Sequence, residues 1–74
     1  MNIEEKLFKL NSFKQRIKPI LKYNDQKEIL ISSFGSILNS KDGNSCSFSF
    51  NKDCSFNEDV KKSILKEFHS VYDL

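Results

Sequence analysis

Three side chains in this sequence could bind a soft metal ion or form a nucleophile with its base: Cys46, Cys54 and His69. A structural zinc site usually has four ligands, with cysteine pairs about two to four residues apart, and this chain has neither feature. Cysteine catalysis needs a thiol of lowered pKa and a base oriented in a cleft, and a chain of 74 residues has little material for a cleft. We therefore expect no metal site, no cofactor and no enzymatic activity.

The two cysteines have separate expected roles. Cys46 falls on the apolar face of a predicted strand, so we expect a buried thiol. Cys54 lies in the loop that follows, where a disulfide to Cys46 is geometrically conceivable. We expect folding to need no disulfide, because no signal peptide follows Met1 and two cysteines do not make the framework of a small secreted protein.

The basic residues suggest a different chemistry, the recognition of an acidic partner. Residues 1–22 carry six basic and two acidic side chains, whereas the rest of the chain has more acids than lysines. Arg16 is the only arginine, and its planar fork suits a carboxylate or a phosphate. Exposed loop tips can also carry binding residues without disturbing the core. The residues that we expect to bind a partner are Lys14, Arg16, Lys18, Lys22, Lys41 and Asn44.

These features favour a small non-enzymatic protein-binding module, an inhibitor or adaptor that occupies an acidic surface of a host protein, such as a nucleic-acid-handling or defence protein. Phe8 is a candidate anchor, because it lies off the apolar stripe of its helix. It either faces solvent or packs under the turn at residues 19–23. Ala and Thr are absent while Lys, Asn, Ile and Phe are abundant, which indicates an AT-rich genome and a phage or mobile-element protein. No apolar run could span a membrane, so we expect a cytoplasmic protein.

The alternative function is a winged-helix-like DNA-binding regulator. The expected order of helices and hairpin fits that template, with Gln26–Phe34 in the major groove and residues 41–44 as the wing. However, Gln26–Phe34 contains no arginine, and Asp42 in the hairpin would repel phosphates. Nucleic acid is therefore the less favoured partner.

The elements that must position these residues form one α+β domain over residues 1–74, with a helical N-terminal region, a central β-hairpin and a C-terminal amphipathic helix. Apolar residues at helical spacing predict a helix over residues 3–18, capped by Asn2, with a break at residues 11–12 left open. Pro19 lacks a donor and clashes one turn back, so it should end the helix and open a turn through Tyr23.

Residues 26–38 admit two interpretations. Their periodicity favours a short helix over Gln26–Phe34, with Gly35 in the left-handed conformation after it and a strand at Ser36–Asn39. Weak helix formers in the same stretch favour instead one long strand over residues 28–38. In both cases Asp42-Gly43 predicts a hairpin turn, and the alternation in residues 46–50 predicts a strand with Cys46, Phe48 and Phe50 on one face.

The C-terminal helix is expected over Glu58–Tyr72. Asn57 caps it, acidic residues occupy its first turn, and Glu58 can pair with Lys62 one turn later. Its apolar face completes a core for which we expect thirteen residues: Leu7, Leu10, Ile17, Ile29, Leu30, Phe34, Cys46, Phe48, Phe50, Val60, Ile64, Phe68 and Val71.

Overall fold

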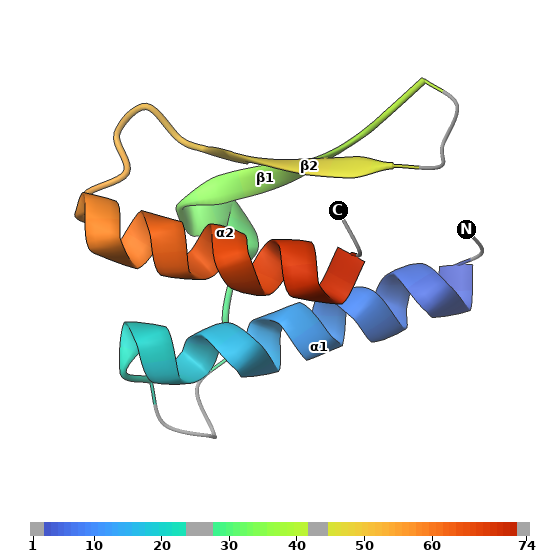
Figure 1. Cartoon of the computed structure of the whole chain (residues 1–74), viewed down its shortest axis with the longest axis horizontal. Coiled ribbons are helices and arrows are strands. Elements are labelled where there is room, and N and C mark those ends of the chain that lie inside the picture. Colours follow the sequence, from blue (N-terminus) through green and yellow to red (C-terminus); the bar gives the residue numbers. More distant parts are fainter. Residues whose placement is uncertain (1–2, 24–27, 42–44, 73–74) are drawn as a thin grey trace.

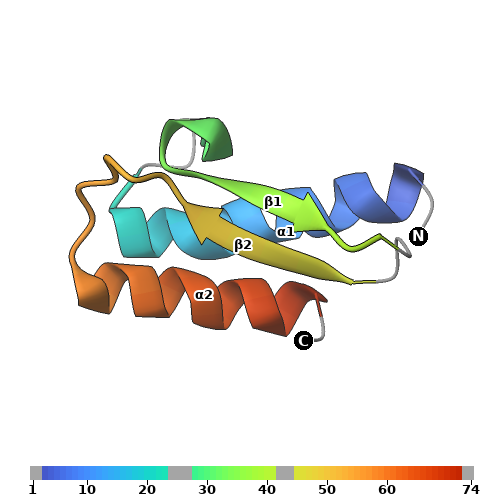
Figure 2. The same ribbon diagram turned by 90° about the horizontal axis from the view of Figure 1, so that it is seen from above.

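A computed structural model of the chain describes residues 3–23, 28–41 and 45–72. The elements follow in the order α1 (Ile3–Leu21), the 3-10 turn η1 (Ile31–Ser33), β1 (Gly35–Asn39), β2 (Cys46–Phe50) and α2 (Glu58–Tyr72). The predicted α+β domain, with an N-terminal helix, a central hairpin and a C-terminal helix, is confirmed. Figure 1 shows the hairpin lying over the two helices. Seen from above, α1 runs beneath β1, and α2 lies on the side of β2 (Figure 2).

The hairpin is antiparallel, with Gly35 opposite Phe50 and Asn39 opposite Cys46. Along β2 the partly buried residues alternate with exposed serines, as the period-2 pattern predicts. The ladder continues to a bond of 2.9 Å from the Ser40 amide to the Ser45 carbonyl. The predicted turn residues Asp42 and Gly43 lie outside the described residues.

The predicted helix over Gln26–Phe34 is wrong in its described part, and so is the single long strand. Residues 28–30 have no regular secondary structure, and Leu30 is extended, with φ −99° and ψ 100°. Only η1 follows, held by a bond of 3.3 Å from the Asn51 side-chain amide to the Ser32 carbonyl. Ser32 and Ser33 are weak helix formers, and the Ser33 hydroxyl donates to the Leu30 carbonyl at 2.7 Å, which favours a turn over a longer helix.

Gly35 does not occupy the left-handed conformation after a helix; it is the first residue of β1. It is needed there because the two strands approach closely. A Cβ at this position would lie 2.6 Å from the Ser49 carbonyl oxygen and 2.7 Å from the Phe48 ring.

Helix α1 runs without a break through residues 11–12 and continues past Pro19, contrary to the prediction. Pro19 is in the last turn, so few helical bonds follow it. The end is closed by two backbone bonds, from the Tyr23 amide to the Lys18 carbonyl at 3.0 Å and from the Lys22 amide to the Pro19 carbonyl at 3.2 Å. Lys22 takes the left-handed conformation, with φ 59°, which completes a Schellman motif without glycine.

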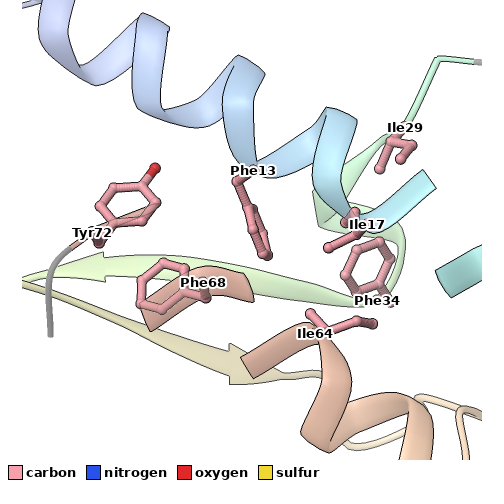
Figure 3. Packing of buried hydrophobic residues seen from close by; sticks show 7 residues of the cluster. All are labelled: Phe13, Ile17, Ile29, Phe34, Ile64, Phe68 and Tyr72. Atoms are coloured by element: carbon pink, nitrogen blue, oxygen red, sulfur yellow. The ribbon is translucent and has the colours of Figure 1, made fainter. Parts of the chain in front are cut away.

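The core lies between α1, α2 and the inner face of the hairpin (Figure 3). Phe13 is fully buried, although the sequence did not indicate it as a core residue. Its ring packs edge-on against Phe48 and Phe68, with ring centroids 5.7 and 5.5 Å apart. Leu7 and Leu30 are 55% and 63% exposed, so their assignment to the core is wrong. The buried cluster is Phe13, Ile17, Ile29, Phe34, Ile64, Phe68 and Tyr72.

Helix α2 begins and ends where the sequence predicts. The Asn57 side-chain oxygen accepts from the Val60 amide at 2.9 Å, which confirms the cap. Glu58 pairs with Lys61 at 3.9 Å, three residues on, and not with the expected Lys62. Because Ile64, Phe68 and Tyr72 are four residues apart, they form the single buried stripe of this helix.

Candidate partner-binding surface

The structure separates the predicted binding residues into two groups. Four of them lie between residues 14 and 22 in the C-terminal half of α1 and just beyond it, whereas Lys41 lies in the hairpin connection. Figure 1 shows the C-terminal end of α1 and the end of the hairpin at opposite ends of the long axis. Asn44 lies outside the described residues. The described residues of this set therefore do not form one continuous surface.

Arg16 is exposed, but its guanidinium already has an intramolecular carboxylate. One of its nitrogens lies 3.3 Å from a Glu67 carboxylate oxygen and donates to the Ser70 hydroxyl at 3.3 Å. The side chain therefore links α1 to α2. An external carboxylate would have to compete with Glu67 for it.

The structure also contradicts the expectation that Lys18 is a surface residue. Lys18 is only 8% exposed, and it sits in the helical turn next to the buried Ile17. Reversing its charge would place a carboxylate at a buried position, which is costly. Of the other predicted lysines, Lys14 is half-buried, and Lys22 and Lys41 are exposed.

The residues that sequence reasoning undervalued lie at the start of α1. Ile3, Leu7 and Phe8 are 75%, 55% and 72% exposed, so Phe8 faces solvent, which was one of its two expected positions. In Figure 1 this end of α1 extends past the last turn of α2, and we call residues 3–8 the α1 overhang. The apolar stripe was visible in the sequence, but its exposure follows from the tertiary packing, in which the side of α1 that carries Arg16 contacts α2.

A groove opens beside the α1 overhang. Its volume is about 200 Å³, and it is lined by Lys6, Leu10, Ile37, Asn39, Cys46 and Tyr72. Within it the Cys46 thiol donates to the Asn39 side-chain oxygen at 3.3 Å. Burial, and secondly the electrostatic interaction with Cys46, raises the pKa of Tyr72, so its hydroxyl stays protonated at neutral pH. The groove has room for an apolar side chain, and Lys6 is the one basic residue of its lining.

The described residues show no cluster of side chains that could hold a metal ion. No three histidine, cysteine or acidic side chains converge anywhere in this part of the chain. Cys46 and Cys54 are free, half-buried thiols. His69 is exposed and packs edge-on against Phe68, with ring centroids 6.0 Å apart.

Comparison of the chain with protein-family models, with curated proteins and with solved structures found no match. Across the described ranges, no helix is long and apolar enough to cross a bilayer.

Proposed function

We propose that this protein is a small non-enzymatic protein-binding module, an inhibitor or adaptor of phage or mobile-element type that occupies an acidic surface of a host protein in the cytoplasm. The observation that carries this proposal is the exposure of Ile3, Leu7 and Phe8 on the α1 overhang. Ile3 and Leu7 share one face of α1, whereas Phe8, about 100° away from Leu7, lines a hollow with Arg16 and Ser70 on the side of α2. Exposed apolar side chains of this kind are typical of interaction surfaces, and aromatic residues are frequent anchors there.

The charge near the overhang supports an acidic partner. Lys6 lies in the overhang itself, and Lys9 follows it, with its ammonium group 5.7 Å from the centre of the Tyr72 ring. The hairpin connection that carries Lys41 lies at the same end of the molecule (Figure 1). In this arrangement the apolar residues would supply most of the affinity, while the lysines would orient the partner and speed association. Lys14, in the middle of α1, is a further residue to test for partner binding, whereas Lys22 follows the opposite end of the helix and would need a separate contact.

The winged-helix alternative has lost its main structural support. The segment that would enter the major groove has no regular secondary structure at residues 28–30 and forms only one 3-10 turn at Ile31–Ser33. The described part of this segment therefore contains no α-helix to enter the major groove, and the only arginine is paired with Glu67. We therefore favour a protein partner.

The experiment is capture of a partner from bacterial lysate with the tagged protein, with and without nuclease, at low and high salt. A nuclease-resistant partner that survives high salt is expected, because an apolar interface depends little on ionic strength. Phe8→Ser should abolish capture. Leu30→Ser is the matched control, because Leu30 is also exposed but lines a different surface, with Tyr23 and Glu28.

Two results would contradict the proposal. Equal capture by the Phe8→Ser protein would show that the overhang is not the interface. Binding to duplex DNA that weakens steeply with salt, with no protein captured, would favour the nucleic-acid alternative.

A further inference from the structure

We propose that the outer edge of β1 is the docking site for an extended segment of the acidic partner, which adds a third strand to the sheet beside the α1 overhang. This inference rests on the proposed function and specifies how the partner binds. It requires a free backbone edge, an uncovered apolar surface next to it, and a charge that selects the incoming strand.

The backbone bonds of the hairpin determine which groups of β1 face outward. The Phe34 carbonyl accepts from the Asn51 amide across the ladder at 2.9 Å. At the other end of the strand, the Ser40 amide donates to the Ser45 carbonyl at 2.9 Å. In an antiparallel ladder the hydrogen-bonded pairs alternate, so the even-numbered residues of β1 bond to β2. The odd-numbered residues direct their amide and carbonyl groups to the outer edge.

Ile37 and Asn39 are the outward-directed residues that remain accessible, because Gly35 is buried. The sheet in the described part of the chain has two strands, and no described residue hydrogen-bonds to the outer backbone groups of Ile37 or Asn39. Free strand edges are usually protected by lysine, proline or a bulge. The β1 sequence Gly-Ser-Ile-Leu-Asn contains no charge and no proline, so this edge can accept another strand.

The apolar surface beside this edge is provided by the α1 overhang. At 100° per residue, Ile3, Leu7 and Leu10 fall within about 60° of one another around α1. Leu10 lines the groove with Ile37, and the other two continue the arc away from the Arg16 side, which contacts α2. Figure 2 shows α1 beneath β1 with α2 on the side of β2, so the arc lies on the side of the β1 outer edge.

The chain already covers the C-terminal half of α1 with an extended segment of its own. Ile29, in the extended approach to η1, is 1% exposed and packs beside Ile17 (Figure 3). No described segment does the same for the α1 overhang, where Ile3 and Leu7 stay exposed. A docked strand would cover the N-terminal half in the way that residues 28–30 cover the C-terminal half.

The charge beside the overhang selects an acidic segment over a second copy of this chain. Lys6 and Lys14 project within or next to the apolar arc, whereas the helical positions of Glu4 and Glu5 lie outside it. In a symmetric pairing of two β1 edges, these lysines would approach their own counterparts, and like charges oppose such a contact. Carboxylates flanking an incoming strand would instead be attracted.

The probe is a short acetylated peptide with alternating valine and threonine between flanking glutamates, titrated into the isotope-labelled protein and followed by NMR. We expect the amides of Ile37 and Asn39 to shift most and to exchange with solvent more slowly, because they acquire hydrogen bonds. The same peptide flanked by lysines, and a version N-methylated on alternate amides, should each bind at least about tenfold more weakly. Equal binding of either control, or no binding at about 1 mM peptide, would overturn the proposal.

Protein variants separate this binding mode from the proposed function. Asn39→Pro removes an outward donor while leaving the ladder bonds, and Asn39→Ala is its matched control. Leu7→Ser, which leaves the hairpin unchanged, should also weaken peptide binding about tenfold. If the captured partner is lost with Phe8→Ser but binds normally to Asn39→Pro and Leu7→Ser, the proposed function stands and the edge-strand mode is wrong. Concentration-dependent self-association through the same amides, without the peptide, would identify a second copy as the occupant and overturn the commitment to a partner.

Discussion

Replacing Phe13 and Phe8 separately by alanine tests the orientation of α1 directly. The two phenylalanines lie five positions apart on one helix, so the substitutions are chemically identical. Phe13 is fully buried and touches Phe48 and Phe68, whereas Phe8 is largely exposed. The structure therefore predicts a large loss of stability for one variant and almost none for the other.

The magnitude for Phe13→Ala follows from its burial. Truncating a buried phenylalanine costs about 3–5 kcal/mol, which combines lost transfer free energy with the cavity that remains. At roughly 0.05–0.15 kcal/mol per residue, a chain of 74 residues has a total stability of only about 4–11 kcal/mol. Loss of Phe13 would therefore remove a large part of the free energy of unfolding and lower the melting temperature by about 12 °C or more. Phe8→Ala should change the free energy of unfolding by less than about 0.5 kcal/mol.

The assay is urea unfolding of the parent and both variants, followed by circular dichroism. If Phe13→Ala does not fold, Phe13→Leu, which leaves a smaller cavity, should show a smaller loss in the same direction. A Phe13→Ala protein as stable as the parent, or a Phe8→Ala protein that is the less stable of the two, would refute the assigned face of α1.

Three further predictions concern the backbone and pH. Gly35→Ala should lower the free energy of unfolding by about 1–3 kcal/mol, because the new Cβ would press on the Ser49 backbone carbonyl, which cannot move away as a side-chain tip could. An unchanged midpoint of urea unfolding would contradict the close approach of the two strands. Lys22→Gly should raise stability by about 0.5–1 kcal/mol, because it relieves a left-handed conformation that costs a residue with a side chain roughly 1–2 kcal/mol. A loss of stability in urea unfolding would show that the contacts of the lysine side chain outweigh the cost of its positive φ. The raised pKa of Tyr72 means that the unfolded chain ionises first, so stability should be unaffected by this group below about pH 10 and fall as pH rises further. Tyr72→Phe should reduce that alkaline loss, measured as unfolding free energy against pH, and an identical alkaline slope in the variant would refute the assignment.

The sequence predicted well those elements whose determinants are local. Asn57 and the apolar spacing that follows it defined α2, and the alternation of phenylalanine with serine defined β2. The predicted end of α1 is wrong because proline does not break a helix when it lies in the last turn. A proline in the last turn leaves few bonds to lose, and Lys22 supplied a cap that normally uses glycine. Local rules thus located the helix and misplaced its boundary.

The candidate surface depended on contacts that are distant in sequence. Arg16 and Glu67 are 51 residues apart, so no local pattern could show that the only arginine was already paired. Likewise, Phe13 and Leu7 are both apolar residues of α1, but they lie about 120° apart around the helix. Only the tertiary packing decides that the face with Phe13 is buried and that Leu7 stays exposed. Charge and spacing predicted which residues could bind a partner, while the tertiary contacts decided which of them are free to do so.

The exposed residues of the α1 overhang are not explained by the stability of the fold. A hairpin of two short strands depends on the helices for its stability, and the buried cluster draws on α1 only from Phe13 onward. Exposed Ile3, Leu7 and Phe8 add little to that cluster, and polar residues with good helix propensity would hold the helix equally well. Exposed apolar side chains beside an unprotected strand edge also increase the risk of aggregation. A sequence optimised for folding alone would replace both features, so their occurrence together supports the view that this end of the molecule is covered by a partner when the protein acts.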